Sequence, residues 1–124
     1  MGTRVCTILL CDDNDLLREL LARIIEGADD LALVGQVGSA EELLDMLAGA
    51  SPDVILLDVN LPGLNGIDGI APLRDAGYMN PIVIMSADRR NEHLAEAAGA
   101  AAFFYKGNTD VGELFSTIRS AIAS

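Results

Sequence analysis

Five short apolar segments recur along the chain, and each is followed by residues with the spacing of an amphipathic helix. Segments with the length and composition of buried strands lie at 5–11, 31–37, 54–58, 82–85 and 101–105. Helical patterns follow at 16–25, 43–47, 66–76, 88–98 and 111–122. Parallel strands need such crossovers, because the chain must return to the same edge of the sheet before the next strand begins. The alternation therefore predicts an α/β fold, a doubly wound (βα)5 unit with five parallel strands and helices on both faces.

Local signals refine the helices. Ser39 with Glu42 has the pattern of a capping box, which predicts that the second helix begins there. Pro72 weakens the third helical pattern, because proline disfavours helix interiors. Either Asn108 or Thr109 is expected to cap the last helix.

The size and charge of the chain limit its class. Its 124 residues are enough for one domain of ordinary size and too few for two, so residues 1–124 are expected to form a single domain. Hydrophobic residues make up 51% of the chain and support one aliphatic core. The formal net charge of −11 repels nucleic acid and anionic membranes, and it favours cations and basic partner surfaces.

The two cysteines, Cys6 and Cys11, lie five residues apart in the first strand and are expected to point to opposite faces of the sheet. Their separation of roughly 16 Å excludes a disulfide, so both are expected to be thiols in a reducing compartment. No signal peptide is apparent, and no segment has the length needed to span a bilayer. These features predict a cytoplasmic location without membrane association.

Polar residues stand at the ends of the predicted strands. The third apolar segment runs directly into a carboxylate at Asp58, where desolvation of a charge is costly. Asp12 and Asp13 follow the first strand, Ser86 the fourth and Lys106 the fifth. Sites in open parallel sheets form at the carboxyl ends of the strands. We therefore expect these five side chains to share one cleft.

Three carboxylates in one cleft repel one another, by about 4 kcal/mol per pair at ~4 Å and an effective dielectric near 20. Such a cluster needs a proton or a divalent cation, and oxygen ligands favour Mg²⁺. Lys106, the one lysine of the chain, and the Ser86 hydroxyl are suited to contact phosphoryl oxygens. Together these groups predict a phosphoryl-transfer centre in which Asp58 attacks phosphorus in line.

Four stretches carry a resemblance to a known family: LLCDDND (9–15), DVILLDVNLPGLNG (53–66), VIMSAD (83–88) and FFYKG (103–107). From about Val5 to Ala123, the chain resembles the receiver domain of two-component response regulators. The resemblance implies a flavodoxin-like strand order of 2-1-3-4-5. It also implies a phosphoacceptor switch rather than a turnover enzyme, with a sensor histidine kinase or a phosphotransfer protein as donor and an output domain or target protein as partner.

The resemblance assigns roles around the phosphoryl group. Asp58 resembles the phospho-acceptor, Ser86 the switch hydroxyl and Lys106 the phosphate-binding lysine. Ala87 resembles the small neighbour that leaves room for the phosphoryl group, and Phe103 the aromatic residue that rotates inward on activation. Phosphorylation would then shift the face formed by the fourth helix, the fifth strand and the fifth helix, and a phosphorylation-dependent homodimer is a further expectation.

The resemblance also implies a Mg²⁺ site. Asp13 would bind the ion directly, Asp12 mainly through water, Asp58 through its carboxylate and Asn60 through its backbone carbonyl. Asn60 and Asp88 fall at positions that tune dephosphorylation in the family.

The sequence departs from the family pattern at two places. Gly107 stands where proline usually follows the lysine, which predicts a more flexible loop after the fifth strand. Pro72 in the third helix is also unusual. The stretch LALVGQVGSAEE (31–42) and the absence of that proline look most like receivers joined to helix-turn-helix output domains, although no such domain is visible here and no direct contact with nucleic acid is expected.

Other classes of function remain to be weighed. A small phosphatase with an aspartyl nucleophile usually has a second aspartate two residues later, where this chain has Asn60. A pseudo-receiver that serves only as an interaction module would be expected to lose the acceptor, an acidic residue or the lysine, and this sequence retains all of them. A nucleotide-binding domain fits less well, because no glycine-rich phosphate loop follows the first strand.

Structural roles compete with functional ones at several positions. Asp12 and Asp13 could simply end a strand and cap a helix, and Ser86 could cap the fourth helix. Tyr105 is expected to be a packing or surface residue, and His93, the single histidine, a surface residue.

Overall fold

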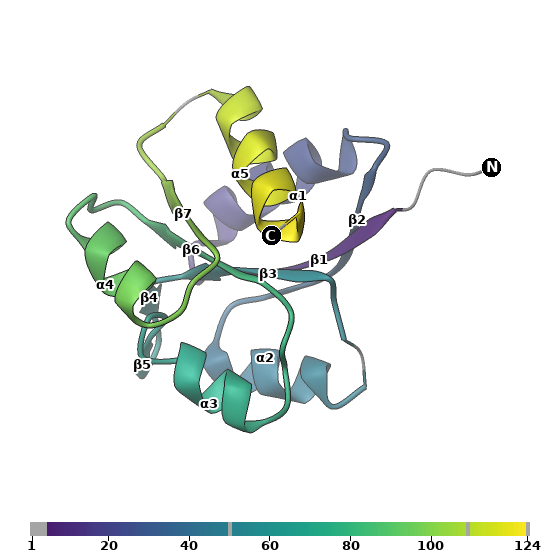
Figure 1. Ribbon diagram of the computed structural model, residues 1–124. Coiled ribbons are helices and arrows are strands. Elements are labelled where there is room, and N and C mark those ends of the chain that lie inside the picture. Colours follow the sequence, from purple (N-terminus) through teal and green to yellow (C-terminus); the bar gives the residue numbers. More distant parts are fainter. Residues whose placement is uncertain (1–4, 50, 109, 124) are drawn as a thin grey trace.

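The computed structural model describes residues 5–49, 51–108 and 110–123. Its main sheet has five parallel strands in the order β2–β1–β3–β6–β7 (Figure 1). Their bounds are Cys6–Cys11 for β1, Leu31–Val37 for β2, Val54–Asp58 for β3, Ile82–Ser86 for β6 and Ala102–Tyr105 for β7. When these strands alone are numbered along the chain, the order is 2-1-3-4-5, which confirms the expected doubly wound topology.

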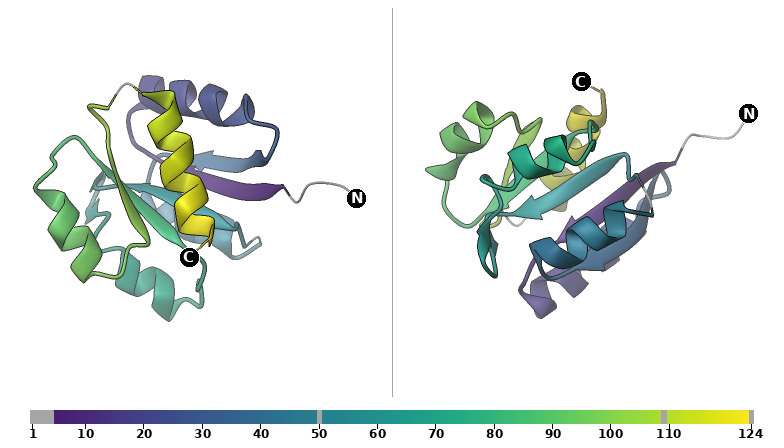
Figure 2. Two further views of the ribbon diagram at one scale, coloured as in Figure 1. Left: turned by 45° about the horizontal axis from the view of Figure 1, so that its top comes forward. Right: turned by 90° about the horizontal axis from the view of Figure 1, so that it is seen from below.

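Five helices cover the two faces of the sheet. They are α1 (Asp15–Glu26), α2 (Ala40–Leu47), α3 (Ile70–Asp75), α4 (Asn91–Ala97) and α5 (Val111–Ala123). Buried residues of α1 and α5 pack on one face, and those of α2, α3 and α4 pack on the other. Figure 1 shows the first pair above the sheet, and the right-hand view of Figure 2 looks onto the side that carries α2 and α3.

Alternate residues of each central strand enter different cores. In β1, Ile8 and Leu10 pack with α1 and α5, while Leu9 and Cys11 pack with the helices of the opposite face. Every residue of β3 and β6 is buried, which explains their unbroken apolar runs. Cys6 lies on the opposite face from Cys11, as predicted, and both are free thiols.

The connection between β3 and α3 differs from the sequence prediction. Residues Asn60–Leu61 (β4) and Leu64–Asn65 (β5) form a small antiparallel hairpin where a plain loop was expected. The helix α3 begins at Ile70 rather than near residue 66, after a turn in which the Asn65 side chain accepts a hydrogen bond from the Ile67 amide. Pro72 occupies the first turn of α3, where no intrahelical N–H bond is required of it.

One helix cap confirms a sequence pattern, and another differs from the prediction. Ser39 caps α2 by accepting a hydrogen bond from the amide of Glu42. Asn108 does not cap α5, because its side chain accepts from the amide of Asp110, and the Asp110 carboxylate accepts from the amide of Gly112 instead. Thr109, the other residue expected to cap this helix, lies outside the described residues.

The remaining boundaries differ from the predictions by a few residues. The strands β1 and β7 each begin one residue later than expected, β6 extends to Ser86, and α4 begins at Asn91 because residues 89–90 form a turn. Among the described helices, none combines the length and apolar character that a membrane span requires.

Gly66 packs directly against the end of β3. A Cβ atom there would overlap the carbonyl oxygen of Asp58 and lie 2.9 Å from its carbonyl carbon. Because backbone rather than a flexible side chain stands in the way, we expect Gly66→Ala to lower the free energy of unfolding by about 2 kcal/mol. Urea denaturation would measure this change. The control is Gly49→Ala, since a Cβ at Gly49 has no neighbour within 4 Å, and an equal loss in both variants would contradict the prediction.

Candidate functional site

The polar residues predicted at the strand ends lie on four consecutive strands of the sheet. Asp12 directly follows β1, Asp58 ends β3, Ser86 ends β6 and Lys106 directly follows β7. Asp12, Asp58 and Ser86 are the buried polar or charged residues in the part of the chain that the structure describes. Parallel pairing thus brings four residues that are up to 94 positions apart in the sequence (106 − 12) to one edge of the sheet, as the sequence predicted.

The Lys106 ammonium group connects the two buried carboxylates. Its Nζ atom lies 2.7 Å from Asp12 Oδ2 and 2.9 Å from Asp58 Oδ1. The Lys106 side chain is only 14% exposed, so solvent screens these ion pairs weakly. Its backbone is fixed as well, because the Lys106 amide donates a hydrogen bond to the carbonyl of Ser86.

Burial controls the ionisation of this pair. Desolvation raises the pKa of the Asp58 carboxyl, and the nearby Asp12 carboxylate raises it further, while Lys106 only partly offsets these effects. Burial alone would lower the pKa of Lys106, but the two carboxylates outweigh it and raise that pKa above its ordinary value. The lysine is therefore held in its charged form.

Two oxygens of the site have no hydrogen-bond partner of good geometry among the described residues. They are Asp12 Oδ2 and Asp58 Oδ1, the same atoms that face Lys106. The other Asp12 oxygen, Oδ1, accepts a hydrogen bond from the amide of Asn14. Ion pairing with Lys106 is therefore what offsets the desolvation of these two oxygens.

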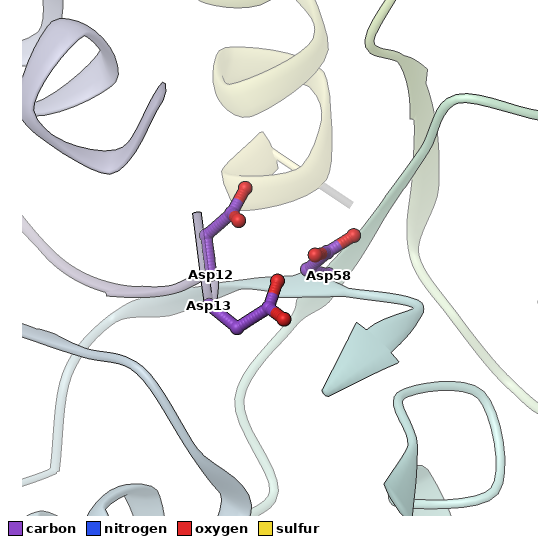
Figure 3. Close-up of side chains that lie close together, drawn as sticks. All are labelled: Asp12, Asp13 and Asp58. Carbon is purple, nitrogen blue, oxygen red and sulfur yellow. The ribbon is translucent and has the colours of Figure 1, made fainter. Parts of the chain in front are cut away.

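The exposed carboxylate of Asp13 completes an acidic cluster with Asp12 and Asp58 (Figure 3). One ligand atom from each residue lies within 4.8 Å of the others, so the cluster can hold a metal ion. Three carboxylates and one ammonium leave two negative charges uncompensated, and oxygen ligands suit a divalent cation such as Mg²⁺. Asn60 lies beside this cluster, and with Asp13 it lines an open polar hollow of about 430 Å³.

The Ser86 hydroxyl is bound by the loop that follows it. Its Oγ atom accepts a hydrogen bond from the amide of Asp88 at 3.0 Å and another from the Asn91 side chain at 2.9 Å. Ser86 does not cap α4, whose N-cap is Arg90. The sequence pattern did not indicate Asn91, because this contact depends on how the loop folds back.

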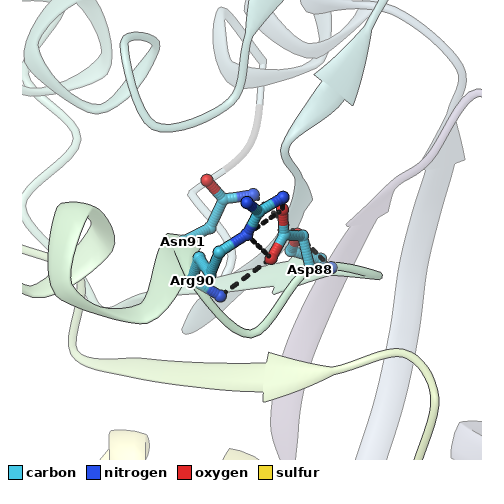
Figure 4. Close-up of polar contacts among 4 residues, drawn as sticks. Asp88, Arg90 and Asn91 are labelled. Carbon is cyan, nitrogen blue, oxygen red and sulfur yellow. Dashed lines mark hydrogen bonds and ion pairs between the residues drawn. The ribbon is translucent and has the colours of Figure 1, made fainter.

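The Asp88 carboxylate forms an ion pair with Arg90. Arg90 contacts both Asp88 oxygens through Nε and Nη2, at 2.7–3.1 Å, and its amide donates to Asp88 Oδ1 as well (Figure 4). These hydrogen bonds lower the pKa of the Asp88 carboxyl. Ala87, between Ser86 and Asp88, is exposed and adds only a methyl group to this part of the loop.

The outer strand β7 carries aromatic residues. Phe103 is half-buried against the core and lines a pocket of about 220 Å³ between α4 and α5. Arg89 stacks on Tyr105 at 4.3 Å from the ring centroid, so Tyr105 has a specific partner beyond general packing. The same ring lies so close to Gly107 that a Cβ atom there would overlap it. Proline, the usual family residue, carries a Cβ atom, and therefore it cannot occupy position 107 with Tyr105 in this place.

Comparison with known proteins assigns this architecture to a class. Residues 8–119, which are most of the chain, match the sequence model of the family described as "Response regulator receiver domain". The chain belongs to this family, the receiver domains of two-component response regulators.

Particular relatives agree with the family assignment. The chain is 32% identical over 119 residues to the nitrate/nitrite response regulator protein NarL of Escherichia coli K12, covering 94% of this chain and 55% of the relative. It thus spans about half the length of that protein. A crystal structure of a LuxR-family two-component response regulator from Aurantimonas sp. SI85-9A1 is 28% identical, with a TM-score of 0.88 over 96% of this chain and 86% of that chain.

The receiver domain of the NarL regulator from Mycobacterium tuberculosis has the same fold, with a TM-score of 0.87. The alignment covers 98% of both chains at 24% identity.

The electrostatics of the site predict the effect of neutralising the acceptor position. We expect Asp58→Asn to raise the free energy of unfolding in Mg²⁺-free buffer by on the order of 1 kcal/mol, or a few degrees in Tm, because it removes a buried charge that burial and Asp12 both disfavour. Thermal denaturation would measure the change. Asp68→Asn, at an exposed carboxylate, is the control and should change little. A lower Tm for Asp58→Asn would contradict the prediction.

The contact between Tyr105 and Gly107 generates a second prediction. Gly107→Ala should displace the Tyr105 ring and end its stacking on Arg89, at a cost below about 1 kcal/mol because only the far end of a side chain must move. The ring-current shift of the Arg89 side-chain NMR signals would report the loss. In a Tyr105→Ala background the same substitution should leave those signals unchanged. A persistent ring-current shift in Gly107→Ala would show that the ring had stayed in place.

Proposed function

We propose that this chain is a phosphoacceptor switch in which Asp58 takes a phosphoryl group from a histidine kinase or a phosphotransfer protein. The observation that carries the proposal is the Lys106 ammonium, 2.7 Å from Asp12 and 2.9 Å from Asp58. A carboxylate beside a fixed ammonium can attack phosphorus while the charge that develops is neutralised at once. Membership of the receiver family supports the same role.

In the proposed transfer, an Asp58 oxygen attacks phosphorus as the bond from phosphorus to the donor imidazole nitrogen breaks, and the electrons of that bond stay on the imidazole. Lys106 contacts a phosphoryl oxygen, and the Ser86 hydroxyl donates a hydrogen bond to another. Bound Mg²⁺ supplies further neutralisation of charge. The residues that would hold it are Asp12, Asp13, Asp58 and, through its backbone carbonyl, Asn60.

Phosphorylation would act as a bias between two conformations. Ser86 would move toward the phosphoryl group, for which the small side chain of Ala87 leaves room. Phe103, at the pocket between α4 and α5, would rotate inward, so that the face of α4, β7 and α5 changes. Asn60 and Asp88 would tune the rate of dephosphorylation, with Arg90 fixing the direction of the Asp88 carboxylate.

The partners belong to the same proposal. The donor would present a basic surface, which a chain of net charge −11 favours. The output would be an attached domain or a separate target protein, and a phosphorylation-dependent homodimer is one form it can take. We infer a single receiver domain over residues 1–124, a cytoplasmic location, a signalling role rather than enzymatic turnover, and no direct contact with nucleic acid.

The test is intact mass spectrometry after incubation with Mg²⁺ and acetyl phosphate. We expect the wild-type protein to gain one phosphoryl group, because the small donor needs no kinase surface. Asp58→Asn should gain none, since it lacks the nucleophile, and excess EDTA should abolish the gain in the wild-type protein.

A second measurement detects a working acceptor site even if the phosphoryl group is hydrolysed before its mass can be recorded. Beryllofluoride forms a stable complex with an acceptor carboxylate and Mg²⁺, and NMR would detect it on the wild-type protein but not on Asp58→Asn. If the wild-type protein gained no mass and formed no such complex, the chain would be a pseudo-receiver that serves as an interaction module.

A further inference from the structure

The loop between β6 and α4 is built on side-chain acceptors. The Asp88 amide donates to Ser86 Oγ, and the Arg90 amide donates to Asp88 Oδ1. The Asn91 side chain then reaches back from the first position of α4 and donates to Ser86 Oγ at 2.9 Å. Three residues of the loop and helix are thereby tied, directly or through Asp88, to the hydroxyl at the end of β6.

These contacts determine what the Ser86 hydroxyl can still do. A serine hydroxyl offers two acceptor positions and one donor proton. The amide of Asp88 and the side chain of Asn91 fill both acceptor positions, and within the described residues the hydroxyl donates to no acceptor. Ser86 is only 2% exposed, so water does not readily take that proton. The hydroxyl is thus prepared to donate to an acceptor-only group that arrives on Asp58.

The helix α4 buries few side chains against the rest of the protein. Of its seven residues, all of which the structure describes, only Ala95 is buried. Leu94 is 59% exposed, and the N-cap residue Arg90 makes no side-chain capping bond. Elements with few buried contacts open and shift at low free-energy cost. The first turn of α4 is held by the hydrogen bond from the Asn91 side chain, by backbone hydrogen bonds to Asp88 and Arg89, and by the stacking of Arg89 on Tyr105. Among these contacts, the Asn91 side chain is the one that joins α4 directly to the Ser86 hydroxyl.

We propose that Asn91 is a positioning residue that orients the Ser86 hydroxyl as a donor and transmits its movement to α4. The inference rests on the proposed phosphorylation of Asp58. When Ser86 moves to donate to the phosphoryl group, its bond from Asn91 carries the N-terminal turn of α4 with it. Without the Asn91 amide, the site can still take the phosphoryl group, but α4 no longer follows.

The experiment compares NMR spectra of the wild-type protein, Asn91→Ala and His93→Ala before and after loading with beryllofluoride and Mg²⁺. His93 is an exposed residue of the same helix and serves as the matched control. In the wild-type protein and in His93→Ala, loading should shift the amides of Val59 and Asn60 and those of residues 92–97. In Asn91→Ala, the Val59 and Asn60 shifts should remain, while the shifts in α4 should fall by about a factor of two or more.

Asn91→Asp is the second variant. It keeps the shape of the side chain but replaces the amide donor with an acceptor, which would take the Ser86 proton. An acidic residue in the first turn favours the helix, so the variant should fold. We expect its rate of phosphorylation by acetyl phosphate to fall by about tenfold, and by more than in Asn91→Ala, because the carboxylate both diverts the hydroxyl and repels the phosphoryl group.

The outcomes separate the two proposals. If the wild-type protein neither loads nor gains a phosphoryl group, the proposed function fails and this inference fails with it. If the wild-type protein loads and α4 responds equally in Asn91→Ala, the role of Asn91 is overturned while the proposed function stands. A phosphorylation rate in Asn91→Asp equal to that of the wild-type protein would overturn the donor orientation.

Discussion

The burial of Asp12 and Asp58 at the ends of two paired strands is the constraint from which the rest of the site follows. The sheet forces Asp12 and Asp58 together, because their strands β1 and β3 are paired neighbours whose apolar residues bury both faces. Desolvation and mutual repulsion oppose this placement, and Lys106 offsets only part of the cost. Hydrophobic burial along the strands thus holds in place an electrostatic imbalance at their ends. A group that binds Asp58 and changes its charge therefore changes the repulsion within the site. The loops around the site, rather than the buried strands, are the segments that can move as a result.

The sequence predicted those features that depend on local pattern. Buried strands such as Val54–Asp58 show as continuous apolar runs, and topology alone brings their terminal residues to one edge, so Asp12, Asp58, Ser86 and Lys106 could be placed together. The hairpin at 60–65 escaped prediction, because its two-residue strands are too short to show a periodic pattern. The cap at Asp110 escaped it, because Asn108, Thr109 and Asp110 are all residue types that cap helices. Asn91 and the stacking of Arg89 escaped it for a different reason. Each contact joins a loop to a distant or folded-back residue, and such geometry exists only in the complete fold.

Hydrophobic burial is distributed unequally over the protein. The central strands are fully buried, whereas α4 contributes a single buried residue and the loop before it is fixed mainly by polar contacts. This distribution places the low-cost movements beside the site rather than within the sheet. Gly107 contributes to a polar contact on the outer strand as well. Because Gly107 has no Cβ atom, the Tyr105 ring can lie against it and stack on the loop residue Arg89. The departure from the family's proline is thus linked to a contact across the face formed by α4, β7 and α5.

The order of the strands also has a consequence for synthesis of the chain. The two buried carboxylates come from β1 and β3, in the first half of the sequence, but their counter-charge comes from Lys106, just after the last strand to leave the ribosome. A partly made chain that collapsed around β1 and β3 would enclose two like charges with no cation beside them. Unless a proton or a cation is taken up, this early state is penalised electrostatically, and Lys106 reduces the penalty when β7 docks at the edge of the sheet. The charge balance of the site is therefore complete only after the last strand of the sheet has docked.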